Sequence, residues 1–109
     1  MRYSVAMQPS VSRLRSIAYH REIASKFSDA LLQHATVNLA RAEHNGTTDP
    51  RYIARWRALL AQPRDVVIAA LHCDDDVMHD LRSCSPFAGA LSPRRRWQLF
   101  RAATPTSPR

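Results

Sequence analysis

A dense cluster of positive charge near the carboxyl end is the part of this chain that points most directly to chemistry. Arg94, Arg95 and Arg96 are consecutive, and Arg101 follows within two helical turns. Guanidinium groups are planar, permanently charged and suited to paired hydrogen bonds with carboxylates and phosphates. We expect these arginines, together with Arg55 on an earlier helix, to contact an anionic partner. The alternative is a solvated helix face with no binding role, since consecutive helical residues spread around the axis.

Acidic residues and possible zinc ligands also occur, but their spacing favours structural roles. The run Asp74-Asp75-Asp76, with Asp80 one turn later, would offer oxygen ligands to a hard divalent cation. Adjacent side chains diverge on a helix, whereas negative charge at a helix amino terminus is favourable by itself, so we interpret the run as a helix cap. A zinc site would need ligands in paired short intervals, which are missing among His72, Cys73, His79 and Cys84. We therefore predict no metal site and no cofactor.

The sequence gives little support for catalysis. Nucleophilic catalysis needs a nucleophile, a base, an orienting group and a cleft that excludes water. Serine, histidine and aspartate are present, but no local turn displays a serine or cysteine as a nucleophile elbow does. The two glycines, Gly46 and Gly89, are too few for a glycine-rich phosphate loop. We predict a protein that is not an enzyme.

Length and composition bound the fold and the class of partner. A chain of 109 residues with 45% hydrophobic residues can form one small folded domain. The net charge is +7, which favours an acidic or nucleic-acid partner, although fifteen arginines against one lysine could also reflect a GC-rich genome. The two cysteines suggest free thiols rather than a disulfide framework. We expect a cytoplasmic location, because neither a secretory signal nor a membrane-spanning run is evident.

The elements that must position these residues are helical. Apolar residues recur at helical spacing from about 12 to 27, and capping residues predict further helices after Ser28 and Asp49, with Asn45-Gly46 as the stop between them. Gln62-Pro63 separates the third helix from a fourth. Within the fourth helix, the segment Val66-Val67-Ile68 taken alone would also fit a strand. A short helix follows the acidic run, and a last helix covers about 93–102. We predict an all-α domain of five or six short helices over residues 10–103, with a flexible segment 1–9 and a disordered tail 104–109.

The predicted packing follows from the same pattern. On the first helix, Arg15, Tyr19, Glu22 and Lys26 fall opposite the apolar arc, whereas Arg21 falls within it, either as an arginine that extends to the surface or as part of a buried ion pair. The segment 85–93 should be a stiff turn that fixes the approach of the last helix, with Ser92 as its cap and Pro93 in its first turn. The predicted core consists of Leu14, Ile17, Leu39, Ile53, Trp56, Leu60, Leu71, Leu81, Phe87, Trp97 and Phe100.

Several of these segments together resemble a family of small uncharacterised bacterial proteins. The resemblance rests on Pro50–Leu60, Leu81–Pro93 and Arg96-Trp97, with support from His20-Arg21 and Asn38–Arg41. It covers most of residues 14–102. Members of this family tend to carry a tryptophan followed by two leucines, and a carboxyl-terminal Ser-Pro-Phe-Gly, Leu, Pro, Arg-Trp pattern.

The resemblance shapes the functional expectation. It implies an association with toxin-like genes, and hence an antitoxin or accessory protein. Cys84 stands where a polar residue is usual in the family, which argues against a metal or disulfide role for it. We therefore predict a non-catalytic binding protein with an acidic, toxin-like protein partner and no membrane partner. The alternative is a small basic transcriptional regulator that binds nucleic acid.

Overall fold

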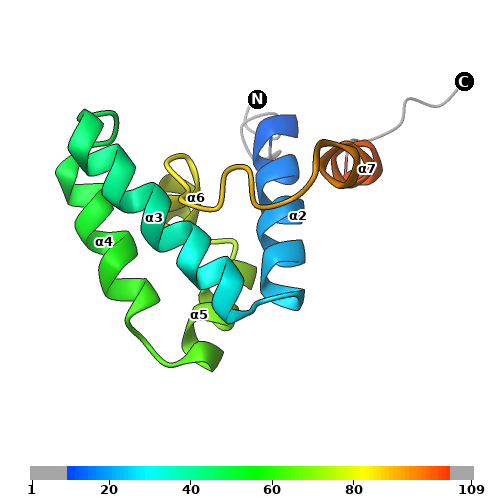
Figure 1. Cartoon of the computed structure of the whole chain (residues 1–109). Coiled ribbons are helices and arrows are strands. Elements are labelled where there is room, and N and C mark those ends of the chain that lie inside the picture. Colours follow the sequence, from blue (N-terminus) through cyan, green and yellow to red (C-terminus); the bar gives the residue numbers. More distant parts are fainter. Residues whose placement is uncertain (1–9, 104–109) are drawn as a thin grey trace, which may run out of the picture.

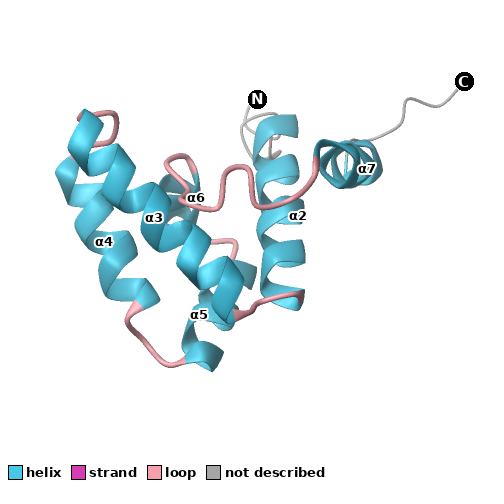
Figure 2. Ribbon diagram, viewed as in Figure 1, coloured by secondary structure: helices cyan, strands magenta, loops and turns pink. Residues whose placement is uncertain are grey.

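The computed structural model describes residues 10–103, and in that range the chain forms six helices and no strand. They are α2 (Val11–Ser25), α3 (Asp29–Asn45), α4 (Pro50–Leu60), α5 (Arg64–His72), α6 (Asp76–Arg82) and α7 (Pro93–Ala103). Figure 2 shows them joined by loops, of which the segment 83–92 between α6 and α7 is the longest. The prediction of a single all-α domain is confirmed, and the expectations for 1–9 and 104–109 lie outside the described residues.

The predicted helix caps are present. The Ser28 hydroxyl accepts from the Leu31 amide at 3.2 Å, Asp49 accepts from the Arg51 amide at 2.8 Å, and Ser92 accepts from the Arg95 amide at 3.1 Å. Gly46 ends α3 with φ 65°, a left-handed conformation that glycine adopts without strain. The first helix begins slightly earlier than predicted, with Ser10 as its cap. The valine-rich segment lies within α5, as the helical interpretation requires.

Helix α2 lies at the centre of the arrangement. Helices α3 and α4 form a hairpin on one side of it, and α7 packs on the other side (Figure 1). Helices α5 and α6 also contact α2. Among residues 10–103, no helix combines the length and the apolar character that a membrane span requires.

The core is centred on two aromatic side chains that are fully buried. Trp56 and Phe87 meet edge to face, with ring centroids 6.0 Å apart, and the Trp56 Nε1 donates to the Leu81 carbonyl at 2.8 Å. Most of the predicted core is buried as expected: Ile17, Leu39, Ile53, Trp56, Leu71, Leu81 and Phe87. Leu14, Leu60 and Phe100 are only half-buried, with the last two packed against the core.

Trp97 is the clear error in the predicted core, since 59% of it is exposed. Helix α7 has α2 as its principal neighbour, so only a narrow stripe of its surface is covered. Arg95 and Leu99 lie in that stripe and are half-buried. Trp97 lies about 200° around the axis from Arg95 and therefore points away from α2.

The second face of α2 also differs from the prediction. Tyr19 is buried and the Glu22 side chain is only 10% exposed, although both were expected opposite the packed face. The cause is that α5 and α7 both pack on α2, so that a one-sided apolar arc does not describe it. Arg21 is exposed and donates to the carbonyl of His72 at 3.3 Å, in agreement with an arginine that extends to the surface.

Candidate functional site

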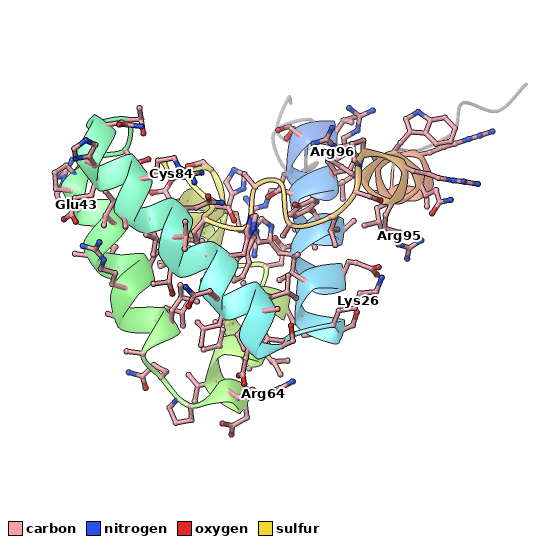
Figure 3. All side chains as sticks on the ribbon, viewed as in Figure 1. Lys26, Glu43, Arg64, Cys84, Arg95 and Arg96 are labelled. Atoms are coloured by element: carbon pink, nitrogen blue, oxygen red, sulfur yellow. The ribbon has the colours of Figure 1, made fainter. Side chains whose placement is uncertain are left out.

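Helix α7 is fixed to α2 by a salt bridge. Arg95 donates from Nε to Glu22 Oε2 at 2.8 Å and from Nη2 to Glu22 Oε1 at 3.2 Å, and the Lys26 ammonium lies 2.7 Å from the same carboxylate. Figure 3 shows Arg95 and Lys26 on neighbouring elements at this joint. Hydrogen bonds from Arg95 and then Lys26 lower the pKa of Glu22 to about 2. The carboxylate is therefore ionised at neutral pH and holds the helix through a charge-assisted fork.

This contact changes the interpretation of one predicted partner-binding residue. Arg95 was expected to contact an anionic partner, but it is half-buried and its guanidinium is already paired within the protein. It also donates to Gln98 Oε1 at 3.2 Å. Among the clustered arginines, Arg95 orients the helix, and Arg94, Arg96 and Arg101 remain exposed.

The outward side of α7 combines an aromatic ring with positive charge. Arg94, Trp97 and Arg101 recur at three- and four-residue spacing and so lie along one side of the helix. The Arg101 guanidinium stacks over the Trp97 ring, 5.1 Å from its centroid. Within residues 10–103, the Arg94 side chain makes no hydrogen bond or ion pair. We call these three residues the α7 surface.

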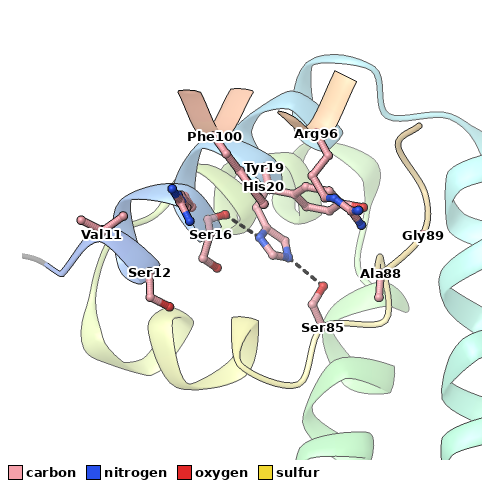
Figure 4. A pocket seen from close by; sticks show the side chains of 11 residues that line it. Val11, Ser12, Ser16, Tyr19, His20, Ser85, Ala88, Gly89, Arg96 and Phe100 are labelled. Carbon is pink, nitrogen blue, oxygen red and sulfur yellow. Dashed lines mark hydrogen bonds between the residues drawn. The ribbon is translucent and has the colours of Figure 1, made fainter. Parts of the chain in front are cut away.

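A groove of about 620 Å³ lies between α2, α7 and the turn after α6 (Figure 4). Its described lining consists of Val11, Ser12, Arg15, Ser16, Tyr19, His20, Ser85, Ala88, Gly89, Arg96 and Phe100. Arg96, predicted to bind a partner, thus borders the groove rather than the outward side of the helix.

The floor of the groove contains a buried histidine and a serine. His20 is 3% exposed, with its Nδ1 2.7 Å from the Ser16 carbonyl and its Nε2 2.7 Å from Ser85 Oγ. A carbonyl can only accept, so the proton belongs on Nδ1, and Ser85 donates to Nε2. Ser85 Oγ in turn accepts from the Phe87 amide at 3.1 Å. These bonds fix the turn after α6 to the middle of α2.

A serine bonded to a histidine is the beginning of a nucleophile–base pair, but this environment weakens the base. Burial is the main cause that lowers the pKa of His20 from its ordinary 6.5 to about 4, and the positive charge of Arg82 adds to it. The imidazole is thus about 300-fold less basic than an exposed one. General-base catalysis is most effective when the pKa lies near the working pH. The pair is better suited to fixing the turn than to activating Ser85.

Sequence reasoning did not identify His20 and Ser85 as a pair. They are 65 positions apart, and no spacing rule connects them. The same holds for Tyr19, whose hydroxyl donates to the Phe87 carbonyl at 2.7 Å and accepts from the Leu91 amide at 3.3 Å. The resemblance includes His20 and Ser85 among its motif residues, which is the one signal that drew attention to both.

Arg55 lies away from the other candidate residues. It is exposed on α4, and its guanidinium lies 6.0 Å from the centroid of the Tyr52 ring. Figure 1 places α4 and α7 at opposite edges of the molecule. The structure therefore does not join Arg55 and the α7 arginines into one surface.

The acidic run has the predicted capping role. Asp75 accepts from the Met78 amide at 2.8 Å and caps α6, while Asp74 and Asp76 form ion pairs with Arg13 on α2. The hydrogen bond from Met78 is the main cause that lowers the pKa of Asp75. In the described part of the chain, no three metal-ligating side chains converge, and Cys73 and Cys84 are half-buried free thiols.

Comparisons of the chain with protein-family models, curated proteins and solved structures found no match. The α7 surface and the groove are therefore the two candidate sites of this chain.

Proposed function

We propose that this chain is a non-catalytic binding protein that contacts an acidic protein partner through the α7 surface. One observation carries the proposal: Trp97 is 59% exposed and lies between Arg94 and Arg101 on a helix that an internal salt bridge holds in place. In the terms of the resemblance, the protein would be an antitoxin or an accessory protein of a toxin–antitoxin-type pair.

The composition of the α7 surface supports protein binding. Tryptophan and arginine are the residue types most enriched among those that dominate binding energies at protein interfaces. An exposed indole has apolar surface to bury, and the adjacent guanidinium groups select carboxylates. Because Glu22 already fixes α7 through Arg95, little further ordering of the helix opposes association.

Isothermal titration calorimetry tests the proposal by measuring the affinity of this chain for the protein product of the adjacent gene. We expect Trp97→Ala and Arg94→Gln each to weaken binding about tenfold or more, as for central interface residues. Arg41→Gln is the matched control, because Arg41 is also exposed but lies on α3. Unchanged affinity for both α7 variants would contradict the proposal.

A nucleic-acid-binding regulator is the second candidate, and the same tryptophan favours it. Bases stack on exposed aromatic rings, while arginines contact the phosphates. Fluorescence anisotropy with a labelled 20-nucleotide single strand and its duplex, from 50 to 300 mM salt, distinguishes the two functions. Phosphate binding should weaken log-linearly with salt, whereas a protein interface with an apolar centre should change less. Steep salt-dependent binding of either probe that depends on Trp97, with no protein complex, would favour the regulator.

A further inference from the structure

The groove between α2 and α7 has the size and chemical lining of a small-ligand site. Its volume of about 620 Å³ lies within the range of small-molecule pockets. Phe100, Tyr19 and Val11 provide apolar surface, whereas Ser12 and Ser16 provide hydroxyl groups. Such a lining suits a ligand with both an apolar body and a polar group.

The charge of the lining selects the sign of that polar group. Arg15 and Arg96 both border the groove, and none of its described lining residues is acidic. The Arg15 guanidinium is stacked 5.6 Å from the Phe100 centroid. The Arg96 guanidinium makes no hydrogen bond or ion pair within residues 10–103, and Figure 4 shows its side chain extending from α7 past the Tyr19 ring. An anionic ligand would give this guanidinium a partner.

The floor of the groove is already ordered. The His20–Ser85 bond and the two hydrogen bonds of the Tyr19 hydroxyl fix the turn that contributes Ala88 and Gly89 to the lining. Gly89 has φ 77°, a conformation that a side chain would strain. A fixed floor reduces the ordering cost of binding. Because His20 is uncharged at neutral pH, positive charge in the groove comes from the arginines.

From this combination we propose that the groove binds a small amphipathic oxyanion, in which an aromatic or branched apolar body carries a carboxylate or a phosphate. The apolar body lies against Phe100 and Tyr19, and the oxyanion pairs with Arg96. The site is separate from the α7 surface, because Trp97 and Arg94 do not line the groove.

Three naphthalene probes test the proposal on the full chain: 2-naphthoate, 2-naphthyl phosphate and the neutral 2-naphthamide. Binding is followed by amide chemical shifts in ¹H–¹⁵N nuclear magnetic resonance spectra. We expect the two anionic probes to shift the backbone amide resonances of Ser12, Ser16, Ala88 and Gly89. The neutral 2-naphthamide should bind about tenfold more weakly or not at all. The tighter of the two anions identifies whether carboxylates or phosphates are the preferred class.

Matched variants separate the groove from the α7 surface. We expect Arg96→Gln to weaken binding of the anions about tenfold, and Arg94→Gln and Trp97→Ala to leave it unchanged. Equal affinity for the neutral probe, no effect of Arg96→Gln, shifts centred on Trp97, or no saturable binding would each overturn the proposal. Loss of partner binding in Trp97→Ala, with naphthoate binding intact, would show that the two sites act independently.

Discussion

The α3–α4 hairpin and the α2–α7 joint are both pairs of packed helices, but they are held together differently. The hairpin connects neighbouring segments, and its ion pair joins Arg57 to Glu43 at 2.9 Å, with about half of each side chain exposed. The α2–α7 region depends on bonds between residues 65 to 73 positions apart, and several of its polar groups are buried.

The hairpin is therefore determined by local sequence, whereas the geometry of the candidate sites depends on contacts between distant residues. A hairpin of amphipathic helices forms from short-range pattern and turn chemistry, and its exposed charges are screened by water. The α2–α7 joint needs specific partners brought from distant parts of the chain. Both candidate sites, the α7 surface and the groove, lie at this second region.

The substitution with the largest expected effect removes a contact that joins the two regions. Trp56 belongs to the hairpin, but its ring packs on Phe87 and its Nε1 donates to Leu81. We expect Trp56→Ala to lower the free energy of unfolding by about 3–5 kcal/mol, because it removes a fully buried aromatic side chain. Urea unfolding followed by circular dichroism measures the change.

Trp97→Ala is the control for this prediction, because it removes the same side chain from the surface. Its effect should remain within about 0.5 kcal/mol, as for other exposed positions. A loss for Trp97→Ala as large as that for Trp56→Ala would mean that α7 buries its tryptophan after all.

The next prediction concerns the pH dependence of the free energy of unfolding, to which the buried His20 of the α2–α7 region should contribute. The buried imidazole of His20 has a pKa of about 4, whereas an unfolded chain has an ordinary histidine pKa near 6.5. Between these values the unfolded state binds more protons than the folded state. The contribution of the neutral, buried imidazole to the free energy of unfolding is therefore complete above pH 6.5 and is lost as the pH falls to 4. We expect the loss to reach about 3 kcal/mol.

Unfolding free energies at pH 7 and 5, with a direct titration of the His20 ring by nuclear magnetic resonance, test this expectation. His44→Gln is the control variant, because His44 is an exposed histidine at the end of α3. A His20 resonance that titrates near pH 6.5 would contradict the buried, neutral state. Measurements above pH 4.5 avoid the loss of the Glu22 carboxylate, whose own contribution disappears as the pH falls towards about 2.

The smallest effect compares the two ion pairs directly. In double-mutant cycles with glutamine substitutions, we expect a larger coupling energy for Glu22–Arg95 than for Glu43–Arg57, because the Glu22 side chain is 10% exposed and that of Glu43 is 58% exposed. Added salt should reduce the second coupling more than the first. Equal couplings at low and high salt would remove the energetic distinction between the regions.

The sequence predicted the local features because they depend on neighbouring residues. Ser28, Asp49 and Ser92 cap the helices as expected, and Gly46 ends α3. Each role requires a side chain or backbone conformation whose partner lies within a few positions. The central burial of Trp56 followed from the apolar spacing of a helix that packs on one face.

The candidate site was harder to predict because it depends on which helices become neighbours. Packing of both α5 and α7 against α2 buries Tyr19 and covers most of the Glu22 side chain, and the orientation set by Arg95 exposes Trp97. The position of Arg96 beside the groove follows from the same orientation. Helical periodicity gives the angle of a residue on its own helix but does not say which side will be covered.

The two tryptophans should differ in their fluorescence, because one is buried and the other is exposed. Trp56 is enclosed by the core, whereas Trp97 lies in water beside two cationic side chains, Arg94 and Arg101. Positive charge draws an anionic quencher towards that indole and repels a cationic one. Iodide should therefore quench the red-shifted emission of Trp97 far more efficiently than caesium does. The blue-shifted emission that remains should come from Trp56.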